Sequence, residues 1–446
     1  MTSPASRACG NKCGIDGGGE PSAVYAFVCF SDYEPGETDS DRSDNPYLGG
    51  KDREAPSSAI VSHNQSLSGD RVSQSHNLQF LESANNLSSV IERKHGWHPN
   101  VEQTQEILAC LRQGRLFYEA SASSPIEIRP LQQFYGMLGF AKALILVTDR
   151  KNRLGNLVGS HALKDTSAPD SQLAELSAKI TGRGTFHYFN DAVASRNKLH
   201  FIEAGSNPRS TEMPCARSNS LENLTINLQA LLSRIPGLED LYESTFRERA
   251  NCASFFLNSL NQGSWNLVVT DSDVPNSRDQ LRAMVNGWRE RYPFLSQWRL
   301  AHVNFAWGKT SLQFANSPPE GDDLDDRYFI ADLINYSAHP DDLARTQFDD
   351  FSAHMSPCSG GFNGAHPYLA SPINGHVVAE YALQYVALFI LSSLVRYRPQ
   401  TWMHSLSRTA MGERRADDAA LALIERLMDI NQTNMPILVD SIINPA

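Results

Sequence analysis

The chain has 446 residues, of which 41% are hydrophobic and 20% are charged, so it carries enough apolar side chains to fold and is neither wholly disordered nor fibrous. Its 50 acidic and 39 basic residues give a net charge of −11, which argues against a protein that coats DNA through a general basic field. A local basic patch for RNA is compatible with this total.

The N-terminal residues do not form a secretory signal. Residues 1–21 are polar, and the first apolar stretch, from Ala23 to Phe30, is too short to supply one. The seven scattered cysteines favour reduced thiols, so we expect a cytoplasmic protein. Cys9 and Cys13 have no second ligand pair nearby, and neither a zinc site there nor any other cofactor is predicted.

A polar tail precedes the folded part. Residues 32–76 are rich in Ser, Asp, Gly and Pro and poor in large apolar groups, so they cannot offset the entropy lost on ordering. We therefore expect a disordered acidic, Ser-rich tail over 1–77 and one helical domain over 78–446.

Hydrophobic periodicity predicts helices along most of that domain. The first begins at Val101, and Gly114 is interpreted as its stop signal. The later ones are expected over 131–147, over 221–235 with Asn219 or Ser220 as the cap, over 377–395, and from Asp417 onward. The segment 377–395 is just short of a bilayer span and contains Glu380 and Gln384, so we expect a buried core helix and no membrane association.

The pattern changes between residues 263 and 316. Three short segments there are β-branched or alternating, and Gly, Asp, Asn or Pro bounds each of them. The predicted fold is therefore mainly α, a helical bundle with a small inserted β-sheet and a disordered N-terminal tail. Gly308-Lys309-Thr310 resembles the end of a phosphate-binding loop, but Val303 occupies the position of its first glycine, so we favour an ordinary turn between strands.

A His-rich segment suggests a metal site. Ala338-His339-Pro340-Asp341-Asp342 resembles the metal-binding signature of sugar-amide deacetylases, and further histidines follow it: His354, His366 and His376. In that family the motif follows the first strand of a nucleotide-type fold, whereas here it lies far along a helical chain. We predict no metal site and interpret the segment as a polar loop.

The end of the long apolar segment offers a catalytic pair. Arg398 and His404 have a spacing that resembles HEPN domains, helical bundles that often act as metal-free RNases. The histidine could move a proton to or from the ribose or the leaving oxygen, while the arginine stabilises charge on the phosphate. The alternative is structural: Pro399 interrupts the helix, and Arg396 and Arg398 can cap its last carbonyls.

Five blocks in order resemble the YaaC-like proteins of bacteria, over residues 100–430 and without the tail. The blocks are LQQFYGMLGFAKALIL from Leu131, SHALK from Ser160, GTFHYF from Gly184, LLSRIPGL from Leu231 and FILSSLVRYRPQTW from Phe389. This resemblance implies a cytoplasmic, mainly helical protein and leaves the reaction open. His404 is not a fixed part of the family pattern, which lowers support for the catalytic pair.

The resemblance also selects candidate site residues. The positions that match recurring family positions are Tyr135, Lys142, His161, Arg396, Tyr397 and Trp402. Lys142 is a lone cation in an apolar helix, so it either extends to water, which is commoner, or pairs with an acid or ligand. The leading hypothesis is a HEPN-like protein that acts on RNA or in defence. The alternative is a non-catalytic helical module that binds a protein partner or itself.

Overall fold

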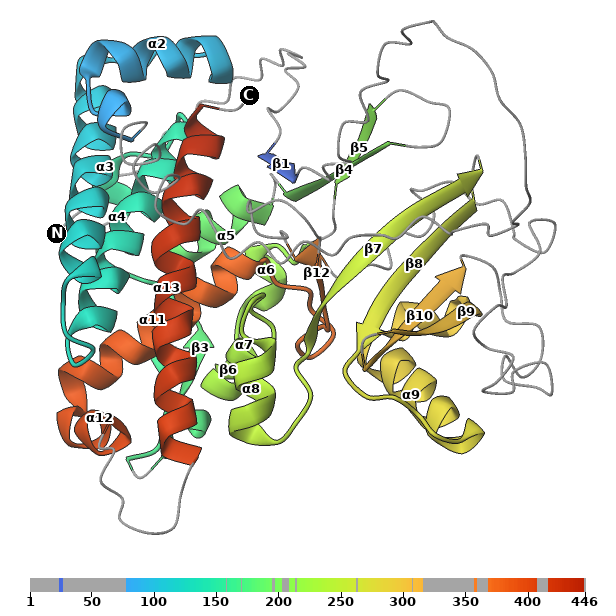
Figure 1. Cartoon of the computed structure of the whole chain (residues 1–446). Helices are drawn as coiled ribbons and strands as arrows, with labels where there is room; N and C mark the ends of the chain where they lie inside the picture. Colours follow the sequence, from blue (N-terminus) through green and yellow to red (C-terminus); the bar gives the residue numbers. More distant parts are fainter. Residues whose placement is uncertain are drawn as a thin grey trace, which may run out of the picture.

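A computed structural model describes the chain over residues 24–26, 78–157, 159–169, 171–194, 197–202, 208–212, 215–261, 264–306, 308–315, 357–358, 368–406 and 416–444. These residues are mainly helical, which confirms the predicted fold class. A helical body and a β-sheet with one covering helix stand side by side (Figure 1). The helices of the body are α2 (Ala84–His95), α3 (Val101–Ala122), α4 (Arg129–Thr148), α5 (Thr185–Ala194), α6 (Ser218–Leu221), α7 (Leu228–Leu232), α8 (Glu239–Phe246), α11 (Glu380–Tyr397), α12 (Pro399–Leu406) and α13 (Ala416–Ile443).

Helix α3 is longer than predicted because Gly114 does not stop it. The helix starts at a capping box, in which Asn100 and Gln103 exchange hydrogen bonds of 2.9 and 3.1 Å. A Cβ on Gly114 would lie 2.4 Å from a ring carbon of Phe140, and one on Gly139 would lie 2.8 Å from the Gly114 nitrogen. The glycine therefore serves the close approach of α3 and α4, and the stop interpretation was wrong.

Helix α11 is the centre of the helical body. Every residue from Glu380 to Leu394 is buried, as predicted for the apolar segment 377–395. Polar side chains in this core form a chain across three helices: the Tyr118 hydroxyl donates to Asn431, Asn431 donates to Gln384 at 2.8 Å, and Gln384 donates to Glu380 at 2.8 Å. Among the described helices, none combines the length and the hydropathy that crossing a bilayer requires.

The helix predicted over 221–235 is broken into three elements. Asn223 adopts a left-handed φ of 71°, which ends α6, and residues Thr225–Asn227 form β6. Asn227 then starts α7, since its side chain accepts a hydrogen bond of 2.8 Å from the Ala230 nitrogen. Leu221, Leu228 and Leu231 are buried as a helical stripe would be, so the apolar spacing was right and the continuous helix was wrong.

Strand β6 belongs to a small antiparallel sheet in the helical body. Its order is β2-β3-β6, with β2 at Leu163–Asp165 and β3 at Ser177–Ile180. A second small sheet has the order β1-β4-β5, with β4 at Asn197–Ile202 and β5 at Pro208–Glu212. Two 3₁₀ turns accompany this body, η1 (Leu154–Leu157) and η2 (Leu173–Glu175).

The predicted β insertion corresponds to a six-stranded sheet. Its order is β11-β12-β7-β8-β10-β9, and all paired strands in it are antiparallel. Gly308, with φ of 71°, turns the chain between β9 and β10, which confirms the turn interpretation. The strands are β7 (Cys252–Asn261), β8 (Ser264–Asp271), β9 (Arg299–Ala306), β10 (Lys309–Ala315), β11 (Pro357–Cys358) and β12 (Tyr368–Ala370). The sheet thus extends beyond the predicted 263–316 at both ends.

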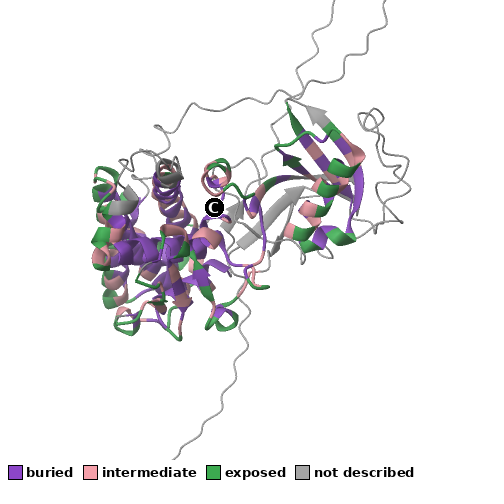
Figure 2. Ribbon diagram, turned by 90° about the horizontal axis from the view of Figure 1, so that it is seen from below, coloured by how far each residue is buried: buried purple, intermediate pink, exposed green. Residues whose placement is uncertain are grey.

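Sequence reasoning did not predict the helix that covers this sheet. Helix α9 spans Arg278–Arg291, and η3 follows it at Pro293–Gln297. Its Leu281, Val285 and Trp288 are buried in a core of their own with the β strands (Figure 2).

The predicted N-terminal tail lies outside the described residues except for one strand. Val24–Ala26 form β1, which pairs in parallel with β4. The remaining part of 1–77, including Cys9 and Cys13, is outside the described ranges.

Candidate functional site

Helices α4 and α11 bring four of the predicted family positions together with a fifth from the loop before β2. We call Tyr135, Lys142, His161, Arg396 and Tyr397 the cationic cluster. The Arg396 guanidinium lies 5.9 Å from the ring centre of Tyr135 and 4.9 Å from that of Tyr397, and its Nη1 donates to the Tyr135 hydroxyl at 3.4 Å. The arginine therefore lies against two aromatic faces, which attract a cation.

His161 packs against two phenylalanine rings at the edge of the cationic cluster. Its ring centre lies 5.6 Å from Phe134 and 6.3 Å from Phe389. Burial lowers the pKa of His161 below its ordinary value, and the positive charges of Arg396 and Lys142 lower it further. No carboxylate of the described residues contributes to this shift, so the imidazole is neutral at pH 7 beside two cations.

Lys142 supplies the second cation and is half-buried on α4. Within the described part of the chain its ammonium has no hydrogen bond or ion pair, as expected for a side chain that reaches water. Its charge also acts on Cys110, whose pKa is raised to about 11 mainly by burial, with Lys142 opposing the rise. A half-buried cation without a carboxylate partner favours an anion as its partner.

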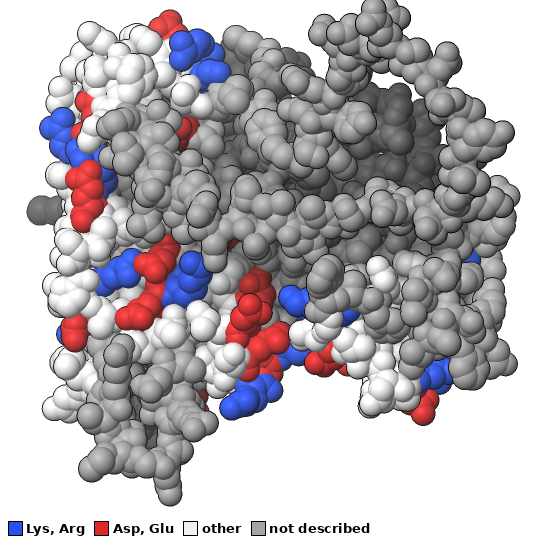
Figure 3. Space-filling model, viewed as in Figure 1, with Lys and Arg blue, Asp and Glu red and all other residues white. Residues whose placement is uncertain are grey.

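The remaining charges do not make a broad basic field. On the face drawn in Figure 3, Lys and Arg atoms alternate with Asp and Glu atoms over the described residues. Tyr397, by contrast, is 71% exposed although it is a large aromatic residue. On this face the described residues therefore form no broad basic field.

The predicted pair of Arg398 and His404 is only half described. The Arg398 guanidinium donates to the carbonyl oxygens of Ser167, at 2.7 Å, and Ala168, in the loop between β2 and η2. His404 lies on α12, and its side chain is outside the described residues. The catalytic pair stays a prediction. As expected, Pro399 separates the two helices, since α11 ends before it and α12 begins with it.

Trp402 has a structural place. It is 2% exposed, and its indole nitrogen donates to the Glu127 carbonyl at 2.9 Å. This side chain fixes α12 against the loop before α4 and does not join the cationic cluster.

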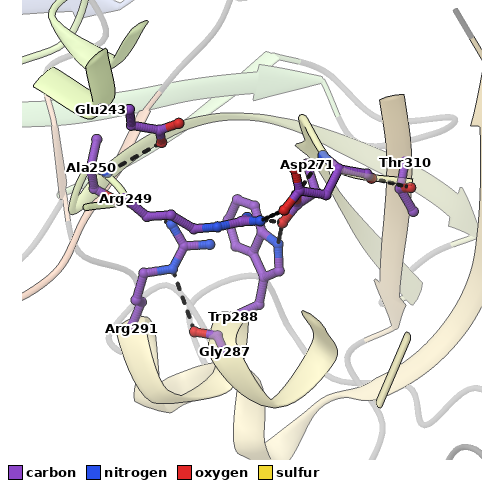
Figure 4. A network of polar contacts seen from close by, with 9 residues as sticks. Glu243, Arg249, Ala250, Asp271, Gly287, Trp288, Arg291 and Thr310 are labelled. Atoms are coloured by element: carbon purple, nitrogen blue, oxygen red, sulfur yellow. Dashed lines mark hydrogen bonds and ion pairs between the residues drawn. The ribbon is translucent and has the colours of Figure 1, made fainter. Parts of the chain in front are cut away.

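A second cluster of polar residues, which the sequence did not predict, lies at the C-terminal end of β8 in the six-stranded sheet (Figure 4). Arg249, which follows α8, forms ion pairs with both Asp271 and Asp273, and the Trp288 indole nitrogen donates to Asp271 at 2.9 Å. Burial raises the pKa of Asp271, but the hydrogen bonds from Arg249, from the Asp273 nitrogen and from Trp288 outweigh it and hold the pKa below its ordinary value.

Arg291 completes this group. Its guanidinium stacks 4.3 Å from the Trp288 ring centre and donates to the Gly287 and Ala250 carbonyls at 3.4 and 3.1 Å. Arg249 and Asp271 are 22 residues apart, so no local motif announced them. The only signal in the sequence was an Asp that directly follows a predicted strand.

The His-rich segment falls mostly in the part of the chain that the structure does not describe. His339, Asp341, Asp342, His354 and His366 lie outside the described residues, while His376 is described. Over the described ranges no group of three or more His, Cys, Asp or Glu side chains could hold a metal ion.

Comparison with known proteins places the whole described domain in one family. The family model for YaaC-like proteins matches residues 72–443, which include both the helical body and the six-stranded sheet. The chain belongs to the YaaC-like protein family. No curated protein and no solved structure matches it. The family match begins near the predicted end of the tail, and it leaves the activity to be argued from the residues.

Proposed function

We propose that this YaaC-like protein binds single-stranded RNA at the cationic cluster. The observation that carries the proposal is the grouping of Arg396 and Lys142 beside a neutral histidine, next to the exposed ring of Tyr397. Single-stranded nucleic acids are held by cations that contact phosphates and by aromatic rings on which bases stack. The cluster offers both kinds of group within one small area.

The charges of the cluster support this proposal. Burial is the largest cause of the lowered pKa of His161, and the charges of Arg396 and Lys142 lower it further, because a protonated imidazole would add a third positive charge to the cluster. A phosphate would raise the pKa of His161 again. RNA affinity should therefore increase as the pH falls from 7.5 to 6, and this increase should be absent in His161→Gln.

The test is fluorescence anisotropy with a labelled single-stranded RNA of mixed sequence, measured over a series of salt concentrations. We expect Arg396→Gln to weaken binding about tenfold, and to reduce the slope of log K against log salt by about 0.7, because one phosphate contact is lost. Tyr397→Ala should weaken binding by a similar factor without changing the slope, since stacking releases no counterion.

The control is Arg93→Gln, which removes an exposed arginine from the end of α2 and should leave the affinity unchanged. Equal losses in Arg93→Gln and Arg396→Gln would contradict the proposal, as would a lack of RNA binding at every salt concentration. The second result would favour a non-catalytic module that binds a protein.

RNA cleavage remains a separate part of the proposal. If the Arg398 and His404 pair is catalytic, the bound RNA should be cut without added metal, and His404→Ala should stop cleavage while leaving anisotropy unchanged. The same labelled RNA, run on a denaturing gel after the binding measurement, gives this result.

A further inference from the structure

A pocket of about 540 Å³ lies beside α9, apart from the elements that form the cationic cluster. This volume is within the range of sites that hold small molecules. The side chains that line the pocket come from the loop after α8, the loop after β8 and α9: Arg249, Asp273, Val274, Pro275, Gln280, Ala283, Met284, Gly287 and Arg291.

Helix α9 presents two different faces. Leu281, Val285 and Trp288 lie on one face and are buried against the sheet. The neighbouring face lines the pocket with residues at helical spacing: Gln280, Ala283, Met284, Gly287 and Arg291. One helix therefore both closes the sheet core and forms the floor of a pocket.

Gly287 has no side chain, so it leaves space in the pocket above the helix. A Cβ added there would meet no atom within 4 Å, so packing within the described chain does not require glycine. A glycine inside a helix is unfavourable compared with alanine. Its presence is accounted for if the space above it is occupied by a ligand.

Arg291 provides the charge at one end. Its Nε and Nη1 donate to the Gly287 and Ala250 carbonyls, and no described carboxylate lies within ion-pair distance of it. Arg249, beside it in Figure 4, is already paired with Asp271 and Asp273. Arg291 is therefore the cation of this pocket whose charge an incoming anion can balance, and among the described residues its Nη2 makes no hydrogen bond.

Beyond the charged side chains of Arg291, Arg249 and Asp273, the pocket has an apolar part and an amide. Val274 is 49% exposed there, with Pro275 and Met284 beside it. Gln280 lies eleven residues from Arg291, which is about 16 Å along the helix. Its Oε1 accepts from the Asn276 nitrogen at 2.9 Å, so Nε2 is left to donate.

We propose that this pocket binds a small monocarboxylate with an apolar body, with the carboxylate on Arg291 and the apolar part over Gly287 and Met284. Arginine favours carboxylates because its planar guanidinium donates in a fixed geometry. Asp273 at the same end disfavours groups of higher negative charge. This inference does not depend on RNA binding.

The test uses isothermal titration calorimetry of the full chain with 4-phenylbutyrate and its neutral amide, 4-phenylbutyramide. We expect the carboxylate to bind at least tenfold more tightly than the amide, and Arg291→Gln to remove that difference. Equal affinities for acid and amide in the unchanged protein would overturn the proposal. So would an equal response to inorganic phosphate, which has no apolar body.

A second variant covers the case in which Arg291→Gln fails to fold. Gly287→Leu places a side chain in the open space above α9, so binding should be lost while the thermal unfolding temperature stays the same or rises. The ε-methyl NMR signal of Met284, assigned with Met284→Leu, should shift on addition of 4-phenylbutyrate. Unchanged binding in Gly287→Leu, or an unmoved Met284 signal, would contradict the assignment.

Discussion

Asp271, the last residue of β8, shows how one buried charge can stabilise the end of a strand. Its side chain is fully buried and accepts from Arg249 and Trp288. Asp271→Asn should lower the free energy of unfolding by about 2 kcal/mol at pH 7, because the charge-assisted hydrogen bond from the partly exposed Arg249 is lost. Asp273→Asn is the matched control, because it removes the other carboxylate that pairs with Arg249. The Asp273 side chain is 69% exposed, so this change should alter the free energy of unfolding by less than about 1 kcal/mol.

The same residue gives a pH dependence with a definite sign. The fold lowers the pKa of Asp271, so the unfolded chain binds its proton first as the pH falls. The stabilisation from this carboxylate is therefore present above the ordinary value of 3.8 and is lost as the pH falls through the folded pKa. Urea unfolding curves of the unchanged protein and of Asp271→Asn, measured between pH 7 and pH 2.5, should converge in acid; a constant difference would contradict this account.

Two glycines inside helices should respond to alanine in opposite directions. Gly114→Ala places a methyl group 2.4 Å from the Phe140 ring and should destabilise the protein by about 1–3 kcal/mol. Gly287→Ala meets no atom and should stabilise it by about 0.5–1 kcal/mol, because alanine favours helix. Thermal unfolding of both variants tests this, and shifts of equal sign would show that the packing of α3 on α4 is looser than described.

Helices whose own residue pattern is sufficient to specify them could be predicted from the sequence. The segments 131–147 and 377–395 are apolar on most faces, and each forms a buried helix near the expected bounds. Prediction failed where tertiary contacts overrode the local pattern. Gly114 resembled a stop but serves helix packing, and the stripe over 221–235 is interrupted because β6 pairs with β3.

Helix α9 and the candidate sites also could not be predicted from local sequence patterns. The polar sequence of α9 hid its narrow buried stripe of Leu281, Val285 and Trp288. Tyr135, His161 and Arg396 were selected by family resemblance, and only the fold shows that they meet. Their separation along the chain leaves no spacing from which their contact could have been derived.

At the scale of the whole molecule, the helical body and the sheet have separate hydrophobic cores. Among the described residues, the hydrogen bonds that join them include the one from the Arg234 guanidinium to the Ser371 carbonyl and the one from the Asn251 nitrogen to the Ser233 carbonyl, both of 2.7 Å. Proteins built this way do not unfold in a single step. We therefore expect the two cores to unfold at different urea concentrations.

Two probes can separate these transitions. Trp265 lies in β8, and Trp288 and Trp298 are buried in the sheet core, so fluorescence should report mainly on the sheet, while circular dichroism at 222 nm should follow the helices. Leu312→Ala, which empties part of the sheet core, should move the fluorescence transition alone. Coincident curves for both probes in that variant would contradict two separate cores.

Because α13 packs against the first helices of the helical body, it affects when that body can fold during synthesis. His95 bonds to the Ile443 carbonyl across 348 residues, and Tyr118 bonds to Asn431 across 313. As a ribosome releases the chain, α3 and α4 emerge long before α13, while the strands from Cys252 to Ala315 can already pair. A segment made late thus completes the packing of one made early, and premature termination before α13 would leave α3 and α4 with an uncovered apolar face that chaperones recognise.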